Sequence, residues 1–152
     1  MKIKLSEPWC GWSGLHLEDD YGQEYHCQLS YIDEILSIFG DNFNRFVMGD
    51  NVVLRFDEEG SEAYIVLCDC DYIKCLASRN SFTATELRIW SDDFVREVCR
   101  QILDRKEEWA RFNAIDDDPE DIEEYRNYID THIKPVYELL LERQVVEEKF
   151  DE

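Results

Sequence analysis

The sequence predicts an α+β fold: an antiparallel meander sheet of about five to seven strands, a short helix after an N-terminal hairpin, and two long C-terminal helices packed on the sheet. Up to residue 90, short segments with apolar residues at alternate positions are separated by short turns. Beyond residue 90, apolar residues recur at every third or fourth position, the period of an amphipathic helix. With 152 residues and 44% hydrophobic content, we expect one domain over 1–152 that is sheet-rich over 1–90, helical over 91–148 and frayed over 149–152.

The strands are predicted from alternation and from the turn residues between them. They are expected at residues 2–5, 15–18, 24–29, 45–48, 52–56, 63–68, 72–76 and 83–90. The turns between the later strands are short, and short turns join neighbouring antiparallel strands. Residues 63–68 are apolar on both faces, so we place this strand centrally, with helices covering at least one side of the sheet.

The N-terminal hairpin places two histidines in one row. If the apolar residues of its strands share one face, His16 lies opposite His26 on the outer face. Two imidazoles across a strand pair can hold a metal ion, but Cys10 and Cys27 are not obviously placed to complete the site. We therefore expect a solvated polar pair and no metal.

The sequence also predicts the segments just before and just after this hairpin. Trp9 and Trp12, in a loop rich in Pro and Gly, are expected to cover the core. Ser30 is expected to cap a short helix that Gly40 ends. Its apolar residues have helical spacing; they are Ile32, Ile35, Leu36 and Phe39.

Two longer helices follow. The first begins at Ser91 as cap and extends to Asn113, with Asp92 in its first turn. The second is capped by Asp118, and an apolar stripe runs along it as far as Leu140. Pro135 falls inside this second helix and predicts a kink or a break.

No motif nominates a catalytic residue or a cofactor, so we expect a non-enzymatic protein. The spacing of Cys68, Cys70 and Cys75 matches no zinc motif. Asp69, Asp71 and Lys74 could suggest a metal-dependent nuclease, but a protein of formal charge −20 would repel nucleic acid. The sequence has no glycine-rich phosphate loop, nucleophile elbow or His-Glu-x-x-His.

The charge restricts the partners. There are 36 acidic and 16 basic residues, which argues against direct binding to nucleic acid or to an anionic membrane and favours a basic protein. No uncharged run approaches the ~20 residues of a membrane span. Six cysteines without a signal peptide predict free thiols in the cytoplasm.

The densest cluster of acidic residues lies in the segment that connects the two predicted long helices. Seven of the nine residues from Asp116 to Glu124 are acidic, whereas the dipole and cap of a helix account for three or four carboxylates. Smaller clusters lie in the turns at 18–20 and 57–59. We therefore predict a partner-binding site with two possible aromatic anchors, made of Asp116, Asp117, Asp118, Glu120, Asp121, Glu123, Glu124, Tyr125 and Tyr128.

Size, charge and compartment together suggest a bacterial immunity or antitoxin protein, which neutralises a basic toxin or nuclease through clustered carboxylates. A phage-type inhibitor that mimics DNA is a second possibility. A small enzyme or ligand-binding domain, with a pocket between sheet and helices, is a third. The acidity can also serve solubility alone, although clustering in loops favours recognition.

Overall fold

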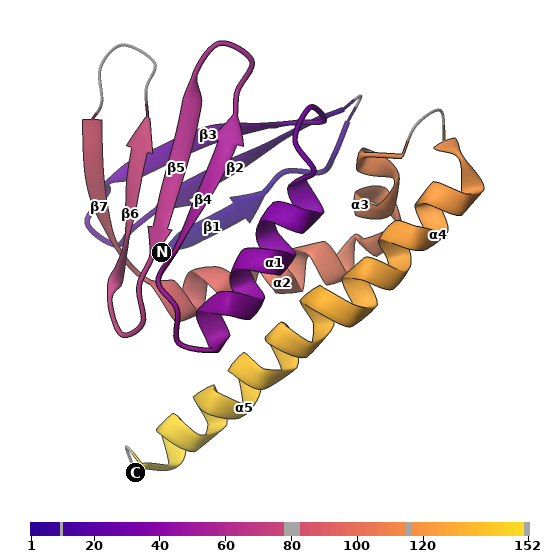
Figure 1. Cartoon of the computed structure of the whole chain (residues 1–152). Coiled ribbons are helices and arrows are strands. Elements are labelled where there is room, and N and C mark those ends of the chain that lie inside the picture. The colour runs from indigo at the N-terminus through magenta and orange to yellow at the C-terminus, as the bar shows by residue number, and fades with distance from the viewer. Residues whose placement is uncertain (10, 78–82, 115–116, 151–152) are drawn as a thin grey trace.

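The chain forms two antiparallel sheets (Figure 1). The computed structural model describes residues 1–9, 11–77, 83–114 and 117–150. The first sheet has the order β1 (Lys2–Leu5), β2 (Trp12–Glu18), β3 (Glu24–Ser30). The second has the order β4 (Val52–Asp57), β5 (Glu62–Leu67), β6 (Tyr72–Ala77), β7 (Thr83–Trp90). The α+β class is confirmed, but the single meander is wrong, because a long helix separates β3 from β4 and the pairing restarts in a second sheet.

The pairing register predicted for the N-terminal hairpin is confirmed. In the β2–β3 hairpin His16 pairs with His26 and Leu17 pairs with Tyr25. Burial alternates along β3, where Tyr25 and its odd-numbered neighbours lie inside. β5 is an inner strand of the second sheet, as its apolar sequence predicted.

Helix α1 (Ile35–Val47) begins and ends later than predicted. Ser30 is not its cap: this buried residue ends β3, and its Oγ accepts a hydrogen bond from the Ile32 amide at 3.2 Å. The strand predicted at 45–48 is also wrong. The helix continues because its apolar stripe does, through Phe39, Phe43, Phe46 and Val47, all buried.

Gly40 lies inside α1 for a steric reason. A Cβ atom at this position would lie 2.4 Å from the hydroxyl oxygen of Tyr128 and 2.7 Å from its ring. Glycine therefore lets a neighbouring helix approach closely. The glycine that follows α1 is Gly49, whose φ of +104° is accessible to glycine.

The helix predicted from Ser91 to Asn113 is broken. α2 (Ser91–Asp104) and α3 (Lys106–Phe112) are separated at Arg105, which has φ −124° and ψ 41°. The five residues from Asp104 to Glu108 are all charged, so no apolar contact with the core holds this stretch straight. Ser91 is the first helical residue and not the cap, and its hydroxyl donates to the Asp71 carbonyl at 3.0 Å.

The last helix accommodates Pro135 without a break. α4 (Pro119–Tyr128) passes through the π-helical segment η2 (Ile129–Ile133) into α5 (Lys134–Phe150), so the helix end lies beyond the predicted residue 148. Pro135 has no amide hydrogen, and its ring would press on the carbonyl four residues earlier in a regular helix. The wider π-helical turn just before it accommodates both effects.

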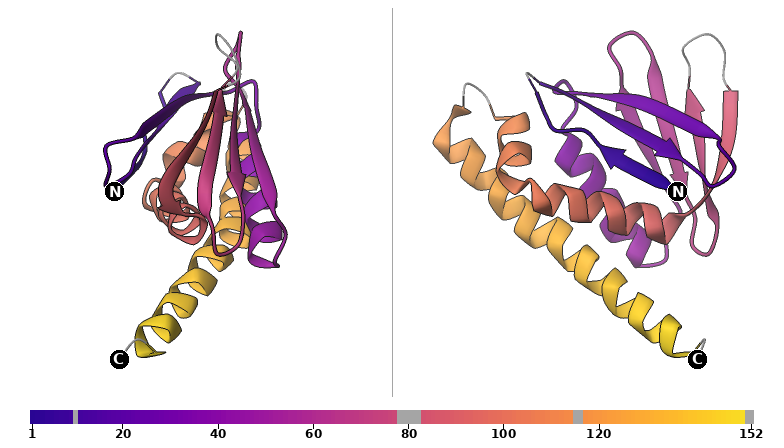
Figure 2. Two further views of the ribbon diagram at one scale, coloured as in Figure 1. Left: turned by 90° about the vertical axis from the view of Figure 1, so that its left-hand side faces the viewer. Right: turned by 180° about the vertical axis from the view of Figure 1, so that it is seen from behind.

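The elements enclose one connected core of buried apolar side chains. The two sheets diverge from a common end, and α2 lies in the opening between them (Figure 2). α4, η2 and α5 form one long continuous helix that lies across α1 and α2 (Figure 1). Within the described residues, no helix combines the length and apolar character needed to cross a membrane.

Side chains, rather than paired strands, connect the two sheets. The buried carboxylate of Asp19, beside β2, accepts a hydrogen bond from the Arg88 amide of β7 at 3.0 Å. The buried carboxylate of Glu58, beyond β4, accepts one from the Gln28 amide of β3 at 2.9 Å. The Tyr25 hydroxyl donates to the Leu76 carbonyl of β6 at 2.7 Å. These acids therefore satisfy backbone groups that strand pairing would otherwise satisfy.

We predict that Gly40→Ala destabilises the protein by about 1–3 kcal/mol, the usual cost of overpacking. The added methyl group collides with the Tyr128 ring. Urea unfolding measures the change. Gly14→Ala is the matched control, because its Cβ would meet only ordinary contacts at 3.6 and 3.8 Å, and a cost as large at Gly14 would contradict the steric account.

We also predict that Asp19→Asn lowers the melting temperature at pH 7 by several degrees. Hydrogen bonds from Arg88, Gln23 and Tyr21 hold the pKa of Asp19 below its usual range. Its stabilising effect is therefore present above the unfolded-state pKa and is lost as pH falls through the lower folded-state pKa.

Melting curves of both proteins from pH 7 to pH 2 should consequently converge on acidification. Asp20→Asn, at the neighbouring exposed carboxylate, is the control and should have a smaller effect. A constant difference between wild type and Asp19→Asn across this range would contradict the assignment.

Candidate functional site

The acidic run predicted at 116–124, which we call the acidic joint, spans the start of α4, and its described residues are largely exposed. Asp118 is the cap of α4, as predicted, and accepts a hydrogen bond from the Glu120 amide at 2.9 Å. Asp117 has φ +55° and is exposed. Asp116 lies outside the described residues. Glu123 is exposed but ion-paired to Arg126 at 2.8 Å, so it is partly neutralised.

The acidic joint adjoins two further acidic residues, Glu34, which immediately precedes α1, and Asp41, which lies within it. Glu34 and Asp41 are exposed, and they accept hydrogen bonds from the hydroxyls of Tyr125 at 3.4 Å and Tyr128 at 2.6 Å. Burial, and then the charges of Glu34, Asp121 and Glu124, raise the pKa of Tyr125. We call this surface the α1–α4 acidic face: Glu34, Asp41, Asp117, Asp118, Glu120, Asp121 and Glu124. The two predicted tyrosine anchors lie within it, half-buried and bonded to α1.

An aromatic cleft adjoins the α1–α4 acidic face. It has a volume of 820 Å³, and its lining includes Trp9, Tyr31, Phe112 and Asp117. Trp9 is 78% exposed and Tyr31 57% exposed. The expectation that Trp9 covers the core is therefore wrong, because this side chain is exposed and lines the cleft. We call this feature the Trp9–Tyr31 cleft.

The acidic turns at 18–20 and 57–59 differ from the acidic joint in that each contains a buried carboxylate. Asp19 and Glu58 are buried and connect the sheets, so their carboxylates are not available to a partner. The sequence alone could not separate these acids from the exposed ones, because both kinds occur in turns. Ile32, expected in the core, is instead 54% exposed beside Tyr31.

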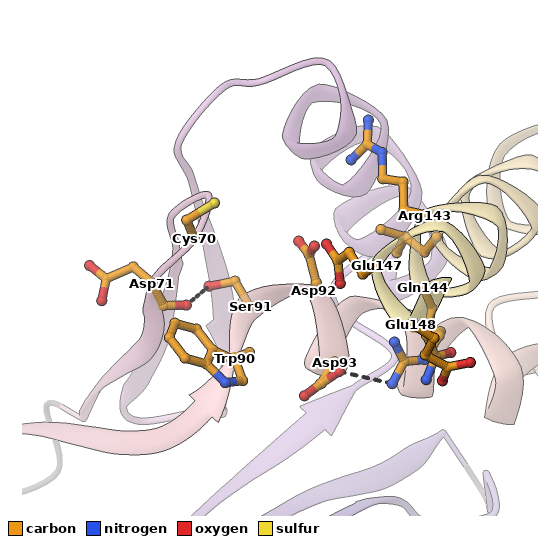
Figure 3. A pocket seen from close by; sticks show the side chains of 12 residues that line it. Cys70, Asp71, Trp90, Ser91, Asp92, Asp93, Arg143, Gln144, Glu147 and Glu148 are labelled. Atoms are coloured by element: carbon orange, nitrogen blue, oxygen red, sulfur yellow. Dashed lines mark hydrogen bonds and ion pairs between the residues drawn. The ribbon is translucent and has the colours of Figure 1, made fainter. Parts of the chain in front are cut away.

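A second pocket, of 470 Å³, lies between the start of α2 and the end of α5 (Figure 3). Asp92, Arg143 and Glu147 line it. One oxygen of Asp92 is buried and accepts no hydrogen bond. Burial, followed by the charge of Asp69, raises the pKa of Asp92, while Arg143 opposes this shift. The pocket therefore contains a half-buried carboxylate whose charge is poorly compensated.

The thiol in this pocket is not activated as a nucleophile. Cys70 is exposed and lies near Asp69, Asp92 and Glu147, whose negative charges raise the pKa of its thiol, Asp69 most strongly. A reactive thiolate requires the opposite, electropositive surroundings. Cys75 is not among the residues that line this pocket, and burial raises the pKa of its thiol to about 12. The pocket is consequently better suited to binding than to thiol chemistry.

We predict that Asp92→Asn leaves stability at pH 7 unchanged or raises it, within about 1 kcal/mol for a half-exposed group. A raised folded-state pKa means that Asp92 stabilises the fold below its unfolded-state value of 3.8 and loses this effect as pH rises through the folded-state pKa. The advantage of the asparagine should therefore disappear in acid.

Melting temperatures between pH 3 and pH 8 measure this dependence. Asp93→Asn, one residue along, is the matched control, because Asp93 is ion-paired to Arg96 at 2.8 Å and its loss should not raise stability. A lower melting temperature for Asp92→Asn at pH 7 would show that the ionised carboxylate stabilises the fold.

Comparison with protein-family models, with curated proteins and with solved structures finds no match to this chain. Function is therefore inferred from the chemistry of its own surfaces. Three of these are defined by geometry: the α1–α4 acidic face with the Trp9–Tyr31 cleft, the Asp92 pocket, and a histidine pair on the outer face of the first sheet.

Proposed function

We propose that this protein is a non-catalytic binding protein that neutralises a basic protein partner, such as a toxin or nuclease, in the manner of an immunity or antitoxin protein. The observation that carries the proposal is the contiguity of exposed aromatic residues and exposed carboxylates. Asp117 belongs both to the Trp9–Tyr31 cleft and to the α1–α4 acidic face. Binding sites commonly combine an aromatic centre with a polar rim.

The charges on this surface support a basic partner. The exposed carboxylates come from α1 and α4 and from the residues just before each helix. Among the neighbouring bases, Arg126 is bound by Glu107 and Glu123, each at 2.8 Å, and Arg111 is one of the residues that line the cleft. A field of one sign accelerates the capture of an oppositely charged protein.

The aromatic residues would determine how long the complex lasts. Trp9 and Tyr31 are among the most exposed large apolar side chains of the described chain. Covering such rings in a complementary interface contributes strongly to affinity, whereas exposed ion pairs at the rim contribute little. In this proposal the carboxylates govern the rate of association and the cleft governs the rate of dissociation.

The Asp92 pocket supports a second candidate function, a small-ligand site. Its volume of 470 Å³ is within the range of ligand pockets. The buried oxygen of Asp92 without a hydrogen-bond donor would suit a ligand that donates one. A DNA mimic uses the same acidic face as the leading proposal and differs in its target.

The test is a charge-reversal variant that replaces Asp117, Glu120, Asp121 and Glu124 with lysine. Asp118 is retained because it caps α4. The assay measures affinity for, and inhibition of, a basic protein encoded beside this chain's gene. We expect affinity to fall at least about tenfold, and wild-type affinity to decrease as salt rises, because added ions screen the attraction.

The matched control reverses four exposed acids of α5, which changes the net charge equally: Glu138, Glu142, Glu147 and Glu148. We expect this control to retain most of its affinity. Full affinity in the joint variant, or affinity independent of salt, would overturn the proposal. Competition by duplex DNA for the same target would favour a DNA mimic.

A further inference from the structure

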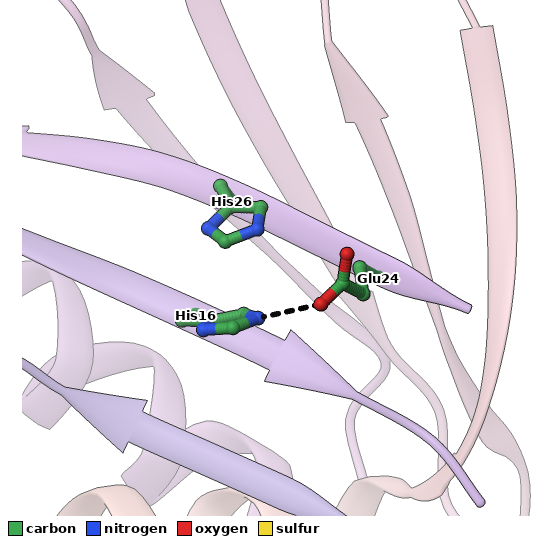
Figure 4. A group of neighbouring side chains, drawn as sticks. All are labelled: His16, Glu24 and His26. Carbon is green, nitrogen blue, oxygen red and sulfur yellow. Dashed lines mark hydrogen bonds and ion pairs between the residues drawn. The ribbon is translucent and has the colours of Figure 1, made fainter. Parts of the chain in front are cut away.

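Three potential metal ligands converge on the outer face of the first sheet (Figure 4). His16 Nε2 lies 3.3 Å from Glu24 Oε1. The rings of His16 and His26 stack with their centroids 3.9 Å apart and their planes 24° apart. One ligand atom of each residue lies within 4.8 Å of the other two, and the described residues contain no second such group of His, Cys, Asp or Glu.

The hairpin backbone fixes these positions. His16 is directly opposite His26 in the β2–β3 register. Glu24 is two residues before His26 on the same strand, so both side chains emerge on the same face. The three ligand positions therefore belong to a hydrogen-bonded strand pair and not to a loop, which limits the movement needed to bind an ion.

We propose that His16, Glu24 and His26 bind one divalent transition-metal ion of the zinc class, with water in the remaining position. Two imidazole nitrogens and one carboxylate oxygen are a common set of protein ligands for Zn²⁺. In a tetrahedral shell with bonds of about 2.1 Å, ligand atoms lie about 3.4 Å apart. The observed separation of 3.3 Å between His16 Nε2 and Glu24 Oε1 already meets this requirement. The two imidazoles are stacked, so the His26 ring must turn until one of its nitrogens also faces the ion.

The sequence offered no obvious third ligand, and we expected a solvated histidine pair without a metal ion. Cys27 is buried with its side chain on the opposite face of the hairpin, and Cys10 lies outside the described residues. Glu24 supplies the ligand instead. Glu18, directly opposite Glu24, adds negative charge that favours a cation, whereas Lys4, opposite His16 on β1, opposes it.

The experiment titrates the full chain with ZnCl₂ and follows the imidazole signals by NMR, with calorimetry for affinity. We expect one ion per chain, and movement of the His16 and His26 signals with little change at His132. Removal of one ligand, in His16→Gln or His26→Gln, should weaken binding at least about tenfold. Glu24→Gln should also weaken it.

Two control variants distinguish this site from others. His132→Gln removes the third histidine, which stacks on Tyr128 in the helical part of the protein. Cys70→Ser removes the exposed thiol, a competing zinc ligand. Both should bind zinc as the wild type does, and zinc should raise the melting temperature of each but not of His16→Gln. Unmoved His16 and His26 signals, or undiminished binding in His16→Gln and His26→Gln, would overturn the proposal.

Discussion

The fold depends on the hydrogen bonds by which side chains join two sheets that do not pair with each other. Asp19 reaches the Arg88 amide and Glu58 reaches the Gln28 amide, while Asp33, after β3, accepts from the Asp57 amide at 2.6 Å. Each carboxylate satisfies a backbone amide at a sheet margin, where an unpaired amide would be costly. The apolar core can then extend from one sheet to the other although the backbone ladder does not.

This arrangement divides the acidic residues of the chain into two groups. Carboxylates such as Asp19 and Glu58 are buried and stabilise the fold, whereas those of the α1–α4 acidic face are mostly exposed. A strongly negative protein therefore does not present its charge evenly. The exposed group lies beside the Trp9–Tyr31 cleft, and this proximity, rather than the net charge, supports our proposal that the protein binds a basic partner.

The candidate sites were only partly predictable from the sequence. The run from Asp116 to Glu124 and its cap at Asp118 were evident from composition and spacing, and so was the pairing of His16 with His26. The contributions of Glu34, Asp41 and Tyr31 were not. Glu34 and Asp41 reach the site through hydrogen bonds from Tyr125 and Tyr128 of α4, and the Tyr31 carbonyl accepts a hydrogen bond from the side chain of Asn113, which is distant in sequence. Glu24 was within reach of sequence reasoning, since its position two residues before His26 fixes the face on which it lies.

By itself the sequence determined the α+β class, the hairpin register, the inner position of β5 and the start of α4, since all of these follow from local periodicity and capping. Only the tertiary structure decided that the strands divide into two sheets, that α1 continues through Gly40, and that Ser91 bonds to a turn instead of capping a helix. Gly40 illustrates the physical reason. A glycine within an apolar helical stripe is compatible with a helix end or with a close helix contact, and the ring of Tyr128, distant in sequence, selects the contact. Local patterns specify which face of an element is apolar, but the partner of that face is set by packing between distant segments.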